Sequence, residues 1–115
     1  MAHFAQVIDG VVAQVIVADT QEWCETNLGG TWVQTSYNTH ANQHPEGRPL
    51  HKNYAGIGHT WDGIGFAAPK PYNSWTLDTE TYLWNAPIPV PVEEGKFFTW
   101  DEPTLSWVEL ILPTE

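Results

Sequence analysis

The chain has 115 residues, a length typical of a single domain. Its 14 acidic residues outnumber four basic ones, so the formal net charge at pH 7 is −10. A charge of this sign repels nucleic-acid phosphates and anionic lipids, so we expect no nucleic-acid partner and no membrane partner. The N-terminus has no secretory signal pattern, and no stretch approaches the ~18 apolar residues of a membrane span, so we expect a cytosolic product.

The N-terminal segment predicts a β-hairpin. Two runs rich in β-branched residues flank Asp9-Gly10, and this dipeptide between such runs is a strong signal for a tight hairpin turn. We therefore expect strands at about residues 3–8 and 11–18.

Residues 20–28 predict one short α-helix. Asp19 or Thr20 can act as its N-cap, Glu22 can serve Asp19 as a capping partner, and the pair Gly29-Gly30 ends it. The helix carries the only cysteine of the chain, which excludes an intramolecular disulfide. We expect this thiol to be buried as a small apolar group.

The next two segments predict a strand followed by a long loop. Residues 31–38 alternate apolar and polar side chains and are dense in residues that favour strands. Residues 39–53 contain proline, glycine and three histidines without any periodicity, so they predict a loop of a length that is usually functional or mobile.

The C-terminal half contains a weak internal repeat. Residues 75–84 and 98–107 share the pattern aromatic, x, apolar, Asp, x, x, Thr, x, x, Trp, at a spacing of 23 residues. Each copy predicts a hairpin whose turn opens at Asp, because this side chain accepts hydrogen bonds from backbone N–H groups further along the turn. We expect four structural turn residues: Asp9, Asp62, Asp78 and Asp101.

Proline-rich spacers lie between these units, and tryptophans supply much of their bulk. Pro87, Pro89 and Pro91 alternate with apolar residues, which predicts an extended segment and excludes a central strand. Five tryptophans are expected to build small cores between hairpins, although some rings could stay exposed for docking or for stacking on sugars. These are Trp32, Trp75, Trp84, Trp100 and Trp107.

The sequence therefore predicts a mainly β fold of antiparallel hairpins with Asp-initiated turns, small Trp-rich cores and one short α-helix. We expect a single domain over residues 1–115. Its parts are a hairpin, helix and strand over 1–38, the loop 39–53, and repeated aromatic hairpins over 54–115.

No residue pattern predicts a catalytic, metal or cofactor site. Four histidines lie within twenty residues, but without a defined ligand spacing: His40, His44, His51 and His59. A glycosidase pair could be sought among five acids, of which three occupy expected turn positions: Asp62, Asp78, Glu80, Asp101 and Glu102. No serine lies in a nucleophile motif. We therefore expect no enzyme, no metal and no cofactor.

Several strings together resemble a known group of proteins. WVQTSYNTH, HKNYAGIGHTWD, PKPYNSWTLDTETYLWNAPIPVP and GKFFTWDEPTLSWVEL are similar to small virion-associated structural proteins of marine tailed phages, including cyanophages. The resemblance covers nearly the whole chain, and it departs at Gly63-Ile64-Gly65, where the group has a more charged turn. It implies a virion component assembled in the host cytoplasm, with capsid or other virion proteins, and copies of itself, as candidate partners.

Three functions follow in order of preference: a capsid decoration or cement protein, a tail or fibre component that binds a receptor or glycan, and a cell-wall hydrolase. Decoration needs only extended segments that can lie on a neighbour. We expect residues 39–53 and 86–92 to supply that contact. Their basic and apolar side chains are the predicted interface: Arg48, Leu50, Lys52, Ile88, Val90 and Val92.

Overall fold

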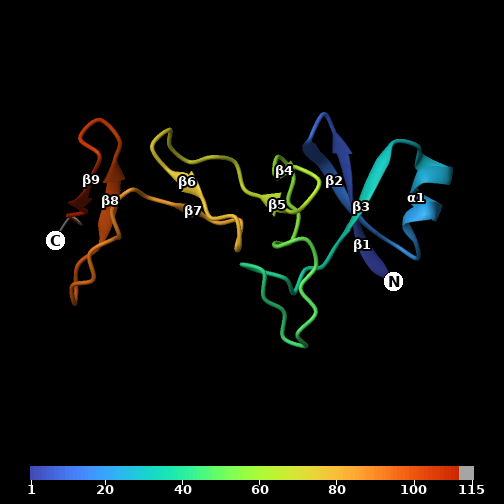
Figure 1. Cartoon of the computed structure of the whole chain (residues 1–115), viewed down its shortest axis with the longest axis horizontal. Helices are drawn as coiled ribbons and strands as arrows, with labels where there is room; N and C mark the ends of the chain where they lie inside the picture. The colour runs from blue at the N-terminus through green and yellow to red at the C-terminus, as the bar shows by residue number, and fades with distance from the viewer. Residues whose placement is uncertain (112–115) are drawn as a thin grey trace. The chain divides into compact units, whose positions relative to one another are not determined.

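The computed structural model describes residues 1–111, which form two compact units. Unit 1 consists of Met1–Pro69 and Asp78–Leu83, and unit 2 consists of Lys70–Leu77 and the described residues from Trp84 onward (Figure 1). The prediction of a mainly β fold with antiparallel sheets and a single short helix is confirmed.

Unit 1 contains a five-stranded antiparallel sheet in the order β3-β1-β2-β4-β5. Its strands are β1 (Ala2–Ile8), β2 (Val11–Ala18), β3 (Thr31–Thr35), β4 (Thr60–Trp61) and β5 (Phe66–Ala67). The last two strands join the N-terminal hairpin. Residues 54–69, which were expected with the C-terminal hairpins, therefore belong to unit 1.

The β1–β2 hairpin turns through Asp9 and Gly10, as the sequence predicts. Ile8 pairs with Val11, and the two loop residues have φ angles of 52° and 77°. Positive φ at both central positions is the turn that matches the twist of the flanking strands. The expected role of Asp9 needs correction, because it lies inside the turn by virtue of its backbone conformation and does not open the turn with its side chain.

Helix α1 (Gln21–Leu28) begins and ends close to the predicted residues. The hydroxyl of Thr20 accepts a hydrogen bond from the Trp23 N–H at 3.0 Å, so Thr20 is the N-cap and the alternative that paired Asp19 with Glu22 is wrong. At the other end, Gly29 is the C-cap. The strand predicted over residues 31–38 ends earlier, at the end of β3.

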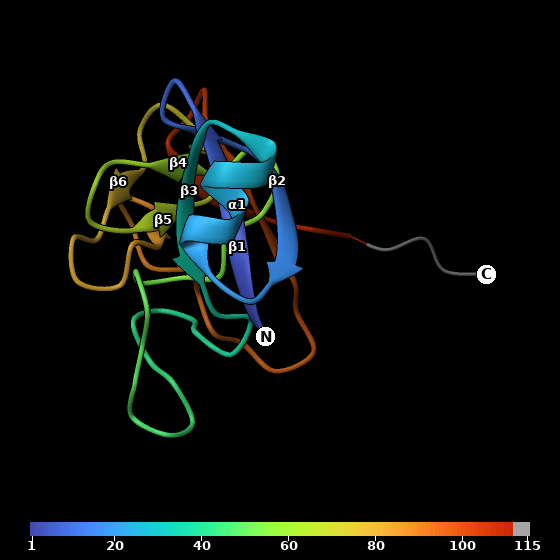
Figure 2. The same ribbon diagram turned by 90° about the vertical axis from the view of Figure 1, so that its right-hand side faces the viewer.

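Both faces of the N-terminal hairpin are covered by apolar groups. On one face Phe4, Ala18 and Trp32 enclose Cys24 of α1, which lies in front of β1 in Figure 2. On the other face a second cluster is formed by Ala5, Val12, Ala55 and Phe66. The strand β2 is only partly covered, since Val12 and Ala18 are buried whereas Val11 and Val17 are exposed. Burial raises the pKa of the Cys24 thiol.

The long loop between β3 and β4 is tied down by buried polar side chains. Thr35, Thr39 and Asn53 are the buried polar residues among those described. The hydroxyl of Thr35 accepts a hydrogen bond from the Ala55 N–H at 2.9 Å, and that of Thr39 accepts one from the Leu50 N–H at 3.2 Å. These bonds give the loop fixed partners for its backbone.

The β4–β5 turn is organised by Asp62. Its Oδ1 accepts hydrogen bonds from the N–H groups of Ile64 (2.8 Å) and Gly65 (3.1 Å), and its Oδ2 accepts one from the Tyr82 hydroxyl (2.7 Å). Partial burial opposes ionisation of Asp62, but these bonds outweigh it, so its pKa lies below the ordinary value. The same carboxylate, with burial, raises the pKa of Tyr82.

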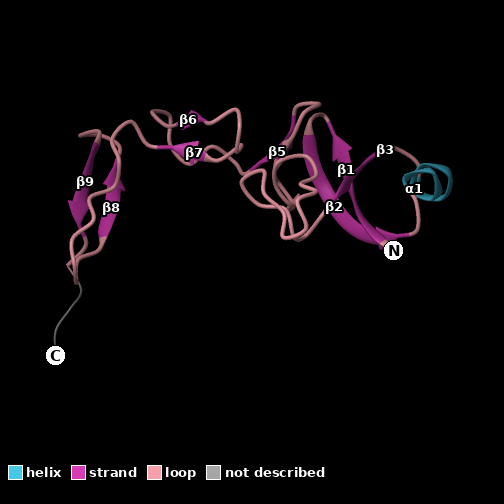
Figure 3. Cartoon of the chain, turned by 60° about the horizontal axis from the view of Figure 1, so that its bottom comes forward, coloured by secondary structure: helices cyan, strands magenta, loops and turns pink. Residues whose placement is uncertain are grey.

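Unit 2 contains the paired strands of two hairpins, β6 (Thr76–Leu77) with β7 (Trp84–Asn85) and β8 (Phe98–Asp101) with β9 (Ser106–Glu109). Each appears in Figure 3 as two short antiparallel strands joined by a loop. The repeat is visible in the register, since Leu77 pairs with Trp84 and Trp100 pairs with Trp107. Each loop also has a left-handed residue at the equivalent position, Tyr82 (φ 55°) and Leu105 (φ 51°).

The two aspartates of the repeat differ in their hydrogen bonds. Oδ1 of Asp78 accepts from the N–H groups of Glu80 (2.8 Å) and Thr81 (3.1 Å), whereas the carboxylate of Asp101 accepts from the Thr104 hydroxyl. The position equivalent to Glu80 is occupied by a proline, which has no N–H to donate. The expected turn geometry is therefore incomplete at Asp101.

Candidate functional site

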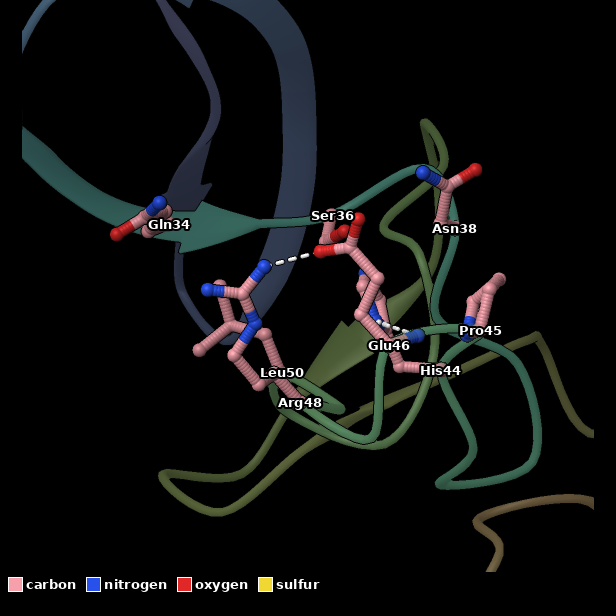
Figure 4. Close-up of a pocket in the computed structure, with 8 residues that line it drawn as sticks. All are labelled: Gln34, Ser36, Asn38, His44, Pro45, Glu46, Arg48 and Leu50. Carbon is pink, nitrogen blue, oxygen red and sulfur yellow. Dashed lines mark hydrogen bonds and ion pairs between the residues drawn. The ribbon is translucent and has the colours of Figure 1, made fainter.

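Two of the predicted interface residues line a shallow pocket in unit 1 of about 370 Å³. Figure 4 shows Arg48 and Leu50 opposite Gln34, which lies at the end of β3. Arg48 forms an exposed ion pair with Glu46, so its charge is already balanced inside the pocket. Ion pairs this exposed contribute only about 0–1 kcal/mol, so a ligand or partner could replace the contact at small cost.

Lys52 differs from its expected role as a partner contact. It is half-buried with φ of 73°, and its Nζ lies 5.6 Å from the centre of the Tyr82 ring. A Cβ atom placed on Gly65 would come within 2.4 Å of the Lys52 Cγ. The side chain therefore packs inside unit 1, where a cation and an aromatic face attract each other.

The remaining predicted contacts lie in unit 2, where Ile88 and Val90 lie beside tryptophans. Ile88 and Val90 are each 48% exposed, and Val92 is 94% exposed. Two of these side chains, together with a proline and three indole rings, line an open groove of about 390 Å³. We call it the tryptophan groove and define it by Trp75, Trp84, Trp107, Ile88, Pro89 and Val90.

Edge-to-face contacts connect two rings of this groove, Trp75 and Trp107, with each other and with Trp100. The ring centre of Trp75 lies 6.0 Å from those of Trp100 and Trp107, and the last two are 5.3 Å apart. Such arrangements add about 0.5–1.5 kcal/mol per pair beyond the burial of area. The Trp107 indole N–H also donates to the Ile88 carbonyl at 2.7 Å. The rings are thus held by neighbours as well as by their own strands.

Glu102 holds the cluster together from one side. Its carboxylate accepts hydrogen bonds from the Ser74 hydroxyl (2.6 Å), the Ser74 N–H (3.0 Å) and the Trp100 indole N–H (2.8 Å). The Ser74 hydroxyl, followed by the Trp100 indole, lowers the pKa of Glu102 below its ordinary value. Three donors occupy this carboxylate, which gives it a structural role.

The Lys70 ammonium group and the Trp75 indole N–H also lie at the groove. The Nζ atom of Lys70 lies 5.8 Å from the centre of the Trp84 ring, and its charge also favours the ionised form of Glu102. The indole N–H of Trp75 is buried without a hydrogen-bond partner in the described part of the chain. Sequence reasoning missed the roles of Ser74 and Lys70, because they lie outside the repeat pattern and no local signal connects them to distant tryptophans.

The histidines considered as metal ligands have separate surroundings. Nδ1 of His44 accepts from the Glu46 N–H at 3.1 Å, and His51 hydrogen-bonds through Nδ1 to the Gln34 carbonyl at 2.7 Å. Burial lowers the pKa of His59. Within residues 1–111, no group of three or more His, Cys, Asp or Glu side chains is placed to hold a metal ion. The described helix is also not of a kind that could span a membrane.

Comparison of the chain with family models, with curated proteins and with solved structures found no match.

Proposed function

We propose that this chain is a non-enzymatic structural protein of a phage virion and that it decorates the capsid. The sequence strings that resemble virion-associated proteins support the proposal. A second source of support is the segment of residues 86–92, which we call the proline strip. The observation that carries the proposal is the way in which this strip presents its apolar side chains.

The proline strip is held by its backbone and leaves its side chains available. The Trp107 indole binds the carbonyl of Ile88, while Val92 projects almost fully into solvent. Alternate prolines restrict the chain before any contact forms, so docking such a strip costs less conformational entropy than docking a flexible loop. A preordered apolar strip on a strongly acidic chain is suited to lie against a neighbouring virion protein or another copy.

Incorporation into particles tests this proposal. The double variant Ile88→Ala/Val90→Ala should be depleted in purified particles, while the isolated protein keeps its melting temperature. A matched control is Ile57→Ala, which removes a 76% exposed apolar side chain from unit 1 and should be incorporated normally. Normal incorporation of the double variant would contradict the docking role of the strip.

The tryptophan groove favours a second candidate, a tail or fibre component that attaches to a receptor or glycan. Its tryptophans are half-buried, and aromatic side chains in such partly desolvated positions are frequent at binding hot spots. Imaging of particles that carry a labelled copy distinguishes the two candidates. Label over the head supports decoration, and label confined to the tail supports attachment.

A further inference from the structure

The tryptophan groove combines three properties of a small-molecule site. Its volume, about 390 Å³, lies within the range of roughly 300–1,000 Å³ common for ligand pockets. Its walls are indole rings and aliphatic side chains, with Asn85 as a polar residue in the lining. None of the lining residues is charged.

The rings of the groove are ordered before any ligand arrives. Trp107 is held through its indole N–H by the Ile88 carbonyl and by edge-to-face ring contacts with Trp75 and Trp100. Trp84 lies in β7, directly paired with Leu77. A rigid aromatic surface loses little entropy on binding, so its contact area is converted into affinity more efficiently than that of mobile side chains.

From these features we infer that the tryptophan groove is a binding site for neutral saccharides. A pyranose ring has C–H groups on its faces and hydroxyl groups around its edge. The faces match the apolar indole surfaces, and the edge matches the amide of Asn85 and the ammonium group of Lys70. The inference concerns the undocked chain, because Ile88 and Val90 line the groove and are also the side chains proposed to contact a neighbour.

Charge favours a neutral ligand over an anionic one. Lys70 is the cation next to the groove, and its charge is offset by Glu102. The chain as a whole carries −10, so an anionic ligand would approach against the field of the protein. Binding of a neutral saccharide should accordingly change little between low and high salt.

A proline-rich peptide is the main alternative ligand for a groove lined by aromatic side chains. In such grooves a polar donor binds a carbonyl of the extended peptide. Here the Trp107 indole N–H already donates to the carbonyl of Ile88, a residue of the chain's own proline strip. An incoming peptide would find this donor occupied, whereas a sugar would use the indole surfaces and the polar rim.

The purified full chain tests the inference on an array of neutral and anionic glycans, followed by calorimetry with soluble neutral hexose oligosaccharides. We expect binding to neutral glycans. Trp84→Ala should weaken it about tenfold, the equivalent of one aromatic contact. The matched control is Trp23→Ala, since Trp23 is 47% exposed on α1 in unit 1 and should contribute nothing.

A second variant keeps the test valid if loss of the ring disturbs β7. Trp84→Phe retains an aromatic face and should bind more tightly than Trp84→Ala, with an unchanged melting temperature. The inference is overturned if no neutral glycan binds, if Trp23→Ala loses affinity equally, or if a Pro-Ile-Pro-Val peptide binds in place of sugars. A negative glycan result leaves the particle incorporation assay unaffected, so the two proposals fail separately.

Discussion

Replacement of Asn53 tests how the long loop of unit 1 is held. This side chain is 8% exposed, and its Oδ1 accepts a hydrogen bond from the Ala41 N–H at 2.8 Å. Its Nδ2 donates to three carbonyls, those of Phe66 (3.0 Å), Thr81 (3.0 Å) and Tyr82 (3.2 Å). One side chain therefore joins the loop, β5 and the segment Asp78–Leu83.

Asn53→Ala removes these bonds and leaves their backbone partners without a substitute. An amide has two N–H donors, so the three carbonyls share two hydrogens, and about three full hydrogen bonds are lost in total. At a net contribution of about 1 kcal/mol each, we expect unfolding to become easier by about 3 kcal/mol. For a chain of this size the melting temperature should fall by about 10–20 °C. Urea unfolding followed by tryptophan fluorescence measures the loss, with the exposed Gln43→Ala as control.

Asn53→Asp separates hydrogen bonding from packing. It keeps the shape and the acceptor for Ala41, but it loses both amide donors and directs a carboxylate at three carbonyl oxygens. This environment should raise the folded-state pKa of the new carboxyl above its unfolded value. The free energy of unfolding of Asn53→Asp should then be highest below the unfolded-state pKa and should decrease as the pH rises through the folded-state pKa. At neutral pH this variant should be less stable than Asn53→Ala. A loss below about 0.5 kcal/mol for Asn53→Ala, or a pH-independent Asp variant, would refute the reasoning.

Gly65→Ala places a Cβ within 2.4 Å of the Lys52 Cγ, so we expect a loss of about 1–3 kcal/mol in urea unfolding, and an unchanged midpoint would contradict this contact. Because the folded-state pKa of Asp62 is lowered, the ionised side chain stabilises the fold at pH values above its ordinary pKa, and this stability is lost as the pH falls through the folded-state pKa. Because the folded-state pKa of Tyr82 is raised, its protonated hydroxyl stabilises the fold at pH values below its ordinary pKa, and this stability is lost as the pH rises through the folded-state pKa. Tyr82→Phe should weaken the pH dependence of the melting temperature in both the acidic and the basic range. Asp78→Ala should cost about 0.5–2 kcal/mol, and Asp78→Asn should cost less because its amide oxygen still accepts backbone N–H groups.

Local signals located the first elements of unit 1 to within a few residues. Asp9-Gly10 between β-branched runs specifies a two-residue hairpin, because few residues tolerate positive φ at both positions. Thr20 and Gly29 limit α1 by satisfying backbone groups at its two ends. The choice between adjacent N-caps, the position of Asp9 inside its turn and the earlier end of β3 needed the structure.

The repeat also predicted two hairpins in the C-terminal half, but neither their register nor every hydrogen bond. The structure shows that Trp100 pairs with Trp107 and that Leu77 pairs with Trp84. The difference between Asp78 and Asp101 depends on Pro103, which occupies the place of a needed N–H. The sequence contains this proline, but only the structures of the two loops show that it removes a backbone N–H that would donate to Asp101.

The candidate site depended on tertiary structure to a greater extent. Sequence reasoning selected the proline strip and the tryptophans separately, but only the folded chain places the Ile88 carbonyl on Trp107 and brings both into the lining of one open groove. In the same way, only the fold turns Lys52 inward over Tyr82 and gives the loop its anchor at Asn53. Turns and helix ends depend on residues a few positions apart, so they can be read from the sequence. These contacts join residues about 13 to 30 positions apart, so they depend on how the side chains pack in the folded chain.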